Sequence, residues 1–256
     1  MRLPVRLPIG PLLAAVLACA FPCVAAAGAM ANWAAVVVAG DYRAHSGAPS
    51  EVFDNARRDL VKALIAKGFA PDHIGQFSVR PERYPKDGVL KSEGTPVLQH
   101  LRALAATAKS GCLIYITSHG SPEGVQVGER LWTPNMMLAL VNDTCSGRPT
   151  VVVISACFSG VFVPLLADPN RMVLTAARPD RASFGCGEQD RYTYFDGCVL
   201  QEIGAAHDFA ALGRAAQACV AQRERDTKAE PASEPQLDIG AELRPMLPLY
   251  AFSASP

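Results

Sequence analysis

The chain has 256 residues, with 24 basic and 24 acidic side chains, so its formal net charge is zero. The basic residues are scattered, which argues against a broad surface for nucleic acid or for an anionic membrane. The length suits a single α/β domain with one substantial core.

The first 27 residues have the pattern of a targeting segment. A basic lead is followed by an apolar core over residues 9–24, and three alanines before Gly28 form a small-residue cleavage site. This core is too short and too interrupted by proline to predict a membrane span. We expect a signal peptide over 1–27, a mature domain over 28–256, and export to the periplasm or the medium. Lipoprotein processing at Cys19, which would attach the protein to a membrane, remains the alternative.

The sequence of the mature chain predicts strands and helices that alternate along the chain. Short apolar runs rich in β-branched residues predict buried parallel strands, and apolar positions at helical spacing predict amphipathic helices. In chain order, strands are expected over residues 34–39, 74–79, 112–117, 150–154 and 171–175. Helices are expected between Ser50 and Gly68, over 95–108, 133–141 and 161–166, from Val199, and over 209–223. Residues 81–94 and 124–128 predict loops, residues 223–234 a mobile charged loop, and residues 235–250 a return to the sheet.

Two of these strands lead into a reactive side chain. The strand at 112–117 is followed by His119, and the strand at 150–154 is followed by Cys157. Because ligands of parallel sheets bind at the carboxyl ends of the strands, both side chains are expected at the same edge. The segment between them has room for one crossover helix, as neighbouring parallel strands require.

Each of these residues has an ordinary explanation when it is taken alone. A cysteine at the end of a buried strand is usually a small core residue, and a histidine after a strand is usually part of a turn. Together, with small residues around both, they predict a nucleophile and its base, because an imidazole that takes the thiol proton generates a thiolate. The N–H groups of Gly120 and Cys157 would then hold the developing oxyanion.

The two motifs resemble those of legumain-type cysteine peptidases. They are Thr-Ser-His-Gly-Ser at residues 117–121 and Ile-Ser-Ala-Cys-Phe-Ser-Gly at residues 154–160. That family includes the catalytic subunit of the GPI transamidase and shares the caspase-like fold. The resemblance implies a caspase-like three-layer α/β/α sandwich with a mostly parallel central sheet. The targeting segment described above indicates that this member of the family is exported and bacterial. It also implies a cysteine endopeptidase that acts on peptide or protein substrates without a metal or an organic cofactor.

The resemblance also implies roles for single residues. His119 would be the general base and acid, Cys157 the nucleophile, and Gly120 a donor to the oxyanion. Asp41 would help to hold the histidine, although an ordinary Asx turn is an equally good reading of this residue. The substrate pocket would be lined by Arg43, Ser155, Ser183 and Asp196.

Arg43 and Asp196 together would give this pocket both charges, which suits an Asn or Asp side chain. A solvated surface pair is the ordinary reading of the same two residues. The preference is weakened because Ser155 stands where legumains have a pocket-lining glutamate.

Two other functions fit the same sequence. A transamidase or ligase would use the same dyad, with an amine in place of water. A non-catalytic exported binding protein would keep the fold, with Cys157 unreactive or in a disulfide.

The mature chain has six cysteines, some of which are expected to pair in an oxidising compartment. They are Cys112, Cys145, Cys157, Cys186, Cys198 and Cys219. Cys157 must remain free if it is the nucleophile. Proximity in the sequence favours a pair between Cys186 and Cys198, although connectivity does not follow from spacing.

Overall fold

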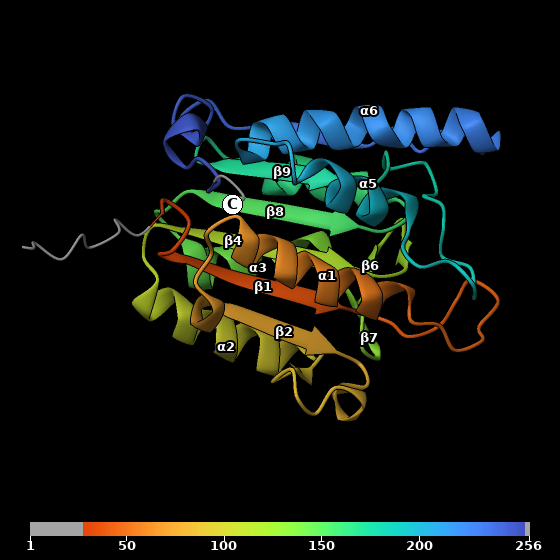
Figure 1. Ribbon diagram of the computed structural model, residues 1–256, viewed down its shortest axis with the longest axis horizontal. Helices are drawn as coiled ribbons and strands as arrows, with labels where there is room; N and C mark the ends of the chain where they lie inside the picture. The colour runs from red at the N-terminus through yellow and green to blue at the C-terminus, as the bar shows by residue number, and fades with distance from the viewer. Residues whose placement is uncertain (1–27, 254–256) are drawn as a thin grey trace, which may run out of the picture.

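Seven strands form one twisted sheet in the order β10-β9-β8-β4-β1-β2-β3 in the computed structural model, which describes residues 28–253 (Figure 1). All neighbours in this sheet are parallel except β10, which runs antiparallel to β9. The strands are β1 (Trp33–Ala39), β2 (Ile74–Ser78), β3 (Leu90–Lys91), β4 (Gly111–Thr117), β8 (Thr150–Ser155), β9 (Arg171–Thr175) and β10 (Gln236–Ile239). The expected signal peptide and Cys19 lie outside the described residues.

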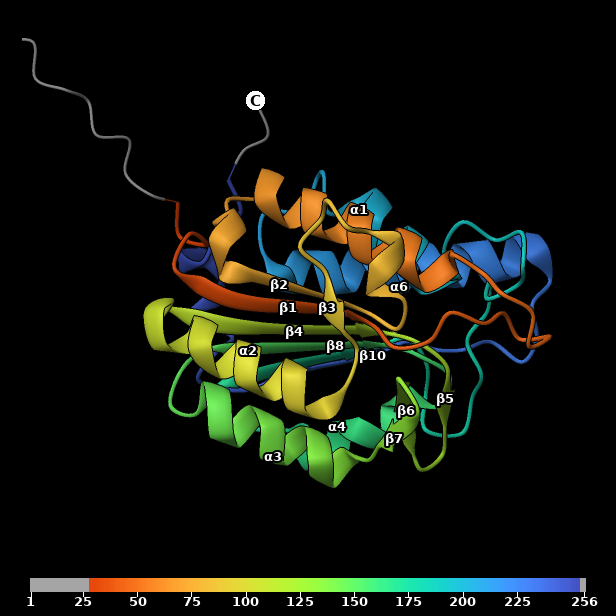
Figure 2. The same ribbon diagram turned by 90° about the horizontal axis from the view of Figure 1, so that it is seen from below.

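Helices cover both faces of the sheet and complete a three-layer α/β/α sandwich. Figure 2 shows the sheet edge-on, with α1 and α6 on one side and α2, α3 and α4 on the other. The first face carries α1 (Val52–Ala66), α5 (Tyr194–Glu202) and α6 (Phe209–Thr227), and the second carries α2 (Gly94–Thr107), α3 (Pro134–Cys145) and α4 (Val163–Leu166). The expected fold class is confirmed.

The central strands are buried on both faces, which explains their continuous apolar sequence. Every residue of β1, β4 and β8 is buried. Alternate side chains of β4 enter different cores: Leu113 and Tyr115 pack with α1, α5 and α6, whereas Ile114 and Ile116 pack with α2 and α3. The period of two therefore places Tyr115 and Thr117 on the α5 face.

The predicted elements are present with shifted boundaries. The five predicted strands agree with the structure to within one residue at each end. The expected loop at 124–128 is wrong, because β5 (Gly120–Ser121), β6 (Gly124–Val127) and β7 (Arg130–Trp132) form a small antiparallel sheet. Helix α5 begins at Tyr194 and not at Val199, and α6 continues through Thr227 into the segment predicted as a loop. Short 3-10 turns occur at η1 (Pro71–His73), η2 (Pro81–Arg83), η3 (Ser159–Phe162) and η4 (Leu247–Leu249).

Two disulfides tie neighbouring elements together. Cys112 of β4 pairs with Cys145 of α3, and Cys198 of α5 pairs with Cys219 of α6. The pair expected between Cys186 and Cys198 is therefore wrong. The partner of Cys198 is set by helix packing, since α5 and α6 lie together on the same face of the sheet. Within residues 28–253, none of the helices has the length and apolar character needed to cross a membrane.

Candidate active site

The histidine and cysteine strands are adjacent and in register. In the ladder between β4 and β8, Thr117 is paired with Ser155. His119 and Cys157 each follow their paired residue by two positions. Their segments therefore leave the same edge of the sheet side by side.

Gly120 lies directly against the backbone of Cys157. A Cβ atom placed on Gly120 would come within 2.2 Å of the Cys157 carbonyl oxygen. Only glycine permits this approach, because real Cβ contacts do not reach such a distance. On β6, the strand that pairs with β5, the amide of Gln126 donates to the His119 carbonyl oxygen over 2.9 Å. In an antiparallel ladder this bond leaves Gly120 N–H unused by β6.

The His119 ring is held from two sides. Its Nε2 atom lies 2.9 Å from the carbonyl oxygen of Arg43. The ring of Phe53, at the start of α1, meets the imidazole edge-to-face at a centroid distance of 5.1 Å. A carbonyl oxygen only accepts hydrogen bonds, so Nε2 carries the proton and Nδ1 of the neutral ring keeps its lone pair.

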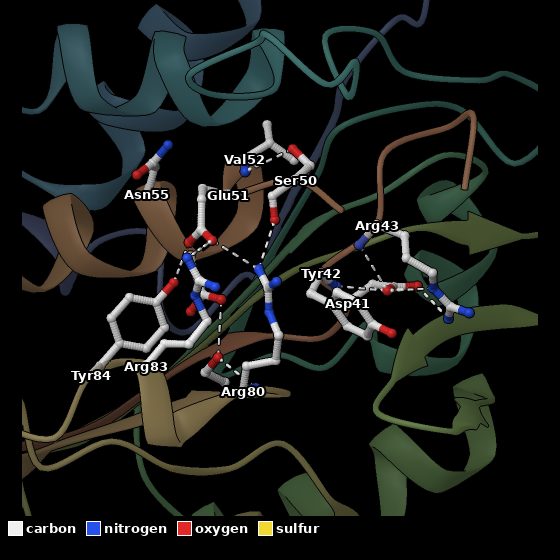
Figure 3. Close-up of polar contacts among 12 residues, drawn as sticks. Asp41, Tyr42, Arg43, Ser50, Glu51, Val52, Asn55, Arg80, Arg83 and Tyr84 are labelled. Atoms are coloured by element: carbon white, nitrogen blue, oxygen red, sulfur yellow. Dashed lines mark hydrogen bonds and ion pairs between the residues drawn. The ribbon is translucent and has the colours of Figure 1, made fainter. Parts of the chain in front are cut away.

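The loop that supplies this carbonyl is shaped by Asp41 (Figure 3). The Asp41 side chain is only 4% exposed. Its Oδ1 accepts from the amides of Tyr42 and Arg43 at 2.6 and 3.1 Å. Its two oxygens also accept hydrogen bonds from Nε and Nη2 of Arg43, both at 3.0 Å. Asp41 therefore makes the Asx turn, and through that turn it places the Arg43 carbonyl at the histidine.

Arg80 links the same loop to the residues before α1, and Figure 3 shows its guanidinium bonded to Ser50 and Glu51. Nη2 of Arg80 donates to the Ser50 carbonyl and to Glu51, both at 3.0 Å. Its guanidinium also stacks 4.6 Å from the Tyr42 ring centre. Glu51 further accepts from Arg83 and Tyr84. Helix α1 begins at Val52, whose amide donates to Ser50 Oγ at 3.2 Å.

The turn that follows β8 is tight and well held. Phe158 has φ 58° and ψ 12°, a left-handed conformation that a bulky side chain rarely adopts. Its amide donates to the Arg181 carbonyl over 2.7 Å. Ser159 Oγ donates to the Ala156 carbonyl over 2.7 Å and accepts from Ala177 N at 3.2 Å. These contacts hold the segment that carries Cys157 in one conformation at the end of β8.

The thiol itself contacts Ser183. Ser183 N donates to Cys157 Sγ at 3.3 Å, and the Ser183 carbonyl and hydroxyl oxygens lie 3.6 Å from the sulfur. Ser183 was expected in the substrate pocket by resemblance, and it does lie beside the sulfur. Cys157 is half-buried and free.

Cys186 is the other free cysteine among the described residues. It packs against Ala39, Val52 and Phe53, so it shares Phe53 with the His119 ring. Burial raises the pKa of the Cys186 thiol to about 11, and the nearby charge of Cys157 adds to the rise. The site therefore holds a second thiol that is protonated at neutral pH.

Asp196 does not lie on an exposed pocket wall. Its side chain is fully buried and accepts hydrogen bonds from Tyr115 Oη at 2.7 Å and Thr117 Oγ1 at 2.5 Å. Arg43 forms its ion pair with Asp41. The expectation that Arg43 and Asp196 together give the substrate pocket both charges is therefore wrong, because Asp196 is buried. Ser155 is also buried, 3.3 Å from Thr193 Oγ1.

Sequence reasoning missed Phe53 and Arg80 as parts of this site. Phe53 falls in the helix expected after Ser50, and nothing in its spacing signals contact with the imidazole. Arg80 lies in a loop after β2, where a lone arginine reads as solvated surface. Their roles depend on tertiary contacts.

Comparisons with known proteins identify a family and a fold for this chain. The sequence profile of the peptidase C13 family matches residues 36–212. A search of curated proteins finds no match. Among solved structures, the crystal structure of caspase-1 from Spodoptera frugiperda is similar, with a TM-score of 0.57 and 14% identity, over 83% of this chain and 88% of that one. A structure of pro-Sf-caspase-1 has a TM-score of 0.55 and 14% identity, over 80% of this chain and 86% of that one.

The structural likeness concerns the fold, and the profile concerns the family. The matched segment includes both strand ends and the loops that carry Asp41 and Ser183. It spans more than half of the chain, and the sheet that it covers is the caspase-like sheet described above. The chain belongs to the peptidase C13 family and is a cysteine peptidase of caspase-like fold.

Proposed function

We propose that this protein is an exported cysteine endopeptidase in which Cys157 is the nucleophile and His119 is the general base and acid. His119 Nδ1 takes the thiol proton as Cys157 Sγ attacks the peptide carbonyl carbon. The N–H groups of Gly120 and Cys157 donate to the oxyanion that forms. His119 then gives its proton to the leaving amine, and a thioester remains on Cys157. Water, deprotonated by the same ring, attacks the thioester carbon, the C–S bond breaks, and the carboxylic acid is released. The ring then returns the proton to the Cys157 thiolate.

The single observation that carries this proposal is the juxtaposition of the two strand ends. Register places the histidine and cysteine segments side by side, and Gly120 touches the carbonyl of Cys157. The hydrogen bond to Arg43 O supports Nδ1 as the base, because it occupies the other ring nitrogen. Cys157 is free, which favours the enzyme over a binding protein whose cysteine is tied in a disulfide.

We further propose that the residue before the scissile bond is an Asn or Asp. The support is Arg43, whose side chain is 47% exposed and whose own carbonyl accepts a hydrogen bond from the His119 ring. A guanidinium has five N–H donors, and Asp41 uses those on Nε and Nη2. The remaining donors suit an amide or carboxylate oxygen of the substrate. A library of peptides that differ at this residue tests the preference, and a bias for large apolar side chains would refute it.

Export is supported by the two disulfides, Cys112–Cys145 and Cys198–Cys219. Disulfides form and persist mainly in oxidising compartments. We propose a periplasmic or secreted location. Fractionation of cells that express the full chain tests it, and a protein found with reduced thiols in the cytoplasm would contradict it.

A thiol-reactive peptidyl probe tests the dyad. We expect the probe to label the wild-type protein, to label Cys157→Ala not at all, and to label His119→Ala far more slowly. Cys186→Ala is the matched control, since it removes the neighbouring free thiol, and it should be labelled like the wild type. Equal labelling of wild type, Cys157→Ala and His119→Ala would defeat the proposal.

A further inference from the structure

A cluster of buried polar side chains lies beneath the two strand ends. Its centre is the carboxylate of Asp196, in the first turn of α5. Tyr115 and Thr117 of β4 donate to its two oxygens, at 2.7 and 2.5 Å. Thr193 caps α5 by accepting from Asp196 N at 3.0 Å, and its hydroxyl lies 3.3 Å from that of Ser155, the last residue of β8.

These contacts reach both strands that carry the dyad. Thr117 precedes His119 by two residues, and Ser155 precedes Cys157 by two residues. Thr117 and Ser155 are also partners in the ladder between β4 and β8. The first turn of α5 therefore contacts the histidine strand through the Asp196 carboxylate and the cysteine strand through the Thr193 hydroxyl.

The same turn also contacts the third wall of the site. Tyr194 N donates to the Phe184 carbonyl over 2.9 Å, and Phe184 follows Ser183, whose amide bonds the Cys157 sulfur. A Cβ on Gly185 would lie 2.8 Å from Tyr194 N, so this loop is packed closely on the helix start. Three segments of the site thus converge on one helical turn.

The carboxylate has no free surface for a substrate. Asp196 is 0% exposed, and each of its oxygens already accepts a short hydrogen bond from β4. Burial raises its pKa, although the hydrogen bonds from Thr117 and Tyr115 oppose this. Burying a carboxylate costs free energy unless it is hydrogen-bonded, so the buried Asp196 side chain depends on Tyr115 and Thr117 remaining in place.

Resting on the proposed function, we propose that Asp196 is a positioning residue: its carboxylate holds the end of the histidine strand to the turn that also contacts the cysteine strand. It acts on the reaction only through the placement of His119 and Cys157. Loss of the carboxylate lets the two strand ends shift relative to each other. A shift of this kind lowers the rate of cleavage by the same factor for every substrate, because no part of the substrate contacts Asp196.

The test uses the full chain and the isosteric variant Asp196→Asn. A carboxamide has one acceptor oxygen, so the hydroxyls of Tyr115 and Thr117 no longer both have an acceptor. We expect kcat to fall about 10- to 100-fold, the size of effect that a misplacement near 1 Å produces. KM should stay nearly constant, and the ranking of peptides that differ before the scissile bond should not change. Alkylation of Cys157 by iodoacetamide should slow in the same variant.

Thr117→Val provides a second variant in case Asp196→Asn does not fold. It removes one donor at nearly constant volume, and we expect the same changes at smaller size. Thr150→Val is the matched control: Thr150 is a buried threonine at the opposite end of β8, and its hydroxyl donates to Arg148 O. It should leave kcat and alkylation unchanged.

Other effects of these variants would overturn the proposal. A changed peptide ranking in Asp196→Asn, or a rise in KM alone, would mean that the carboxylate contacts the substrate. A loss of stability with unchanged kcat and unchanged alkylation would mean a purely structural role. A wild-type protein that cleaves no peptide would refute the proposed function alone, because iodoacetamide still reports the placement of Cys157 beside His119.

Discussion

The Nε2 atom of His119 donates to the backbone carbonyl of Arg43 over 2.9 Å, and this bond orients the ring at the candidate site. A backbone acceptor cannot be changed by mutation, but the turn that presents it can. Asp41 makes that turn, and Phe53 supports the other side of the ring. Both side chains therefore act on the reaction through the position of the imidazole.

Asp41 should show a difference between its two simplest substitutions. Asp41→Ala removes the acceptor of the Tyr42 and Arg43 amides, and we expect kcat/KM to fall about 10- to 100-fold as the carbonyl shifts. Asp41→Asn keeps an oxygen for those amides and should lose only about 3-fold, part of the value of one hydrogen bond. Steady-state kinetics on one peptide checks this. Equal losses in both variants would mean that the negative charge, and not the turn, is what the site requires.

Phe53 should matter more for activity than for stability. Phe53→Leu leaves an apolar side chain but removes the ring edge from His119, and we expect a stability loss of about 1–2 kcal/mol with kcat lowered at least 10-fold. Phe69→Leu is the matched control, since Phe69 is equally buried and packs on Trp33, away from the histidine. It should lose similar stability and keep its kcat. Parallel effects on kcat in both variants would rule out a special role for Phe53.

Cys186 should be unreactive at neutral pH. Because burial raises its pKa to about 11, the thiol is protonated below that pH, and the protonated form is a poor nucleophile. Peptide mapping after brief iodoacetamide treatment should find the label on Cys157 near neutral pH, with Cys186 joining only as the pH approaches 11. In Cys157→Ala, Cys186 should react at a lower pH, because the neighbouring charge is gone. Early labelling of Cys186 in the wild type would contradict this.

Asp59 should contribute stability that acid removes. Burial acts to raise the pKa of its carboxyl, but hydrogen bonds from Tyr192, Lys62 and Arg191 outweigh this and lower the pKa to about 2. The folded state therefore holds the carboxylate more readily than the unfolded state does. This stabilisation of the folded state is present above the pKa of the unfolded chain, near 3.8, and is lost as the pH falls through the folded-state pKa of about 2.

Asp59→Asn should therefore reduce the free energy of unfolding by about 1 kcal/mol near neutral pH, after allowance for solvent screening. The difference from the wild type should close as the pH falls towards 2. Urea unfolding at several pH values measures it. Asp143→Asn, which breaks an exposed pair with Arg102, should change stability little at any pH. A constant Asp59→Asn difference down to pH 2 would contradict the argument.

The sequence predicts the central sheet well, because buried parallel strands carry an uninterrupted local signal. Thr150–Ser155 and Gly111–Thr117 are apolar runs that end in small residues, and their ends lie where parallel pairing requires. The small sheet at β5–β7 is missed because its strands are two to four residues long and two of them, β5 and β6, begin with glycine. The cysteine pairing is missed because it depends on how α5 packs on α6.

Asp196 shows how one boundary changes a functional reading. The family resemblance assigns Asp196 to the substrate pocket, and a helix that starts at Val199 leaves this residue in a loop, where nothing contradicts that role. The structure starts α5 at Tyr194, with Thr193 as its cap. The pattern Thr193-x-x-Asp196 is a recognisable helix start, and it could have placed the carboxylate in the first turn. The contacts with Tyr115 and Thr117 follow only from the packing of that helix on the sheet.

The most direct test of the dyad is a crystal structure of the protein after reaction with a peptidyl aldehyde. We predict a covalent bond to Cys157 Sγ, the adduct oxygen within hydrogen-bonding distance of the amides of Gly120 and Cys157, and Nδ1 of His119 beside the sulfur or that oxygen. An adduct on Cys186, or a His119 ring beyond reach of the adduct, would contradict the account.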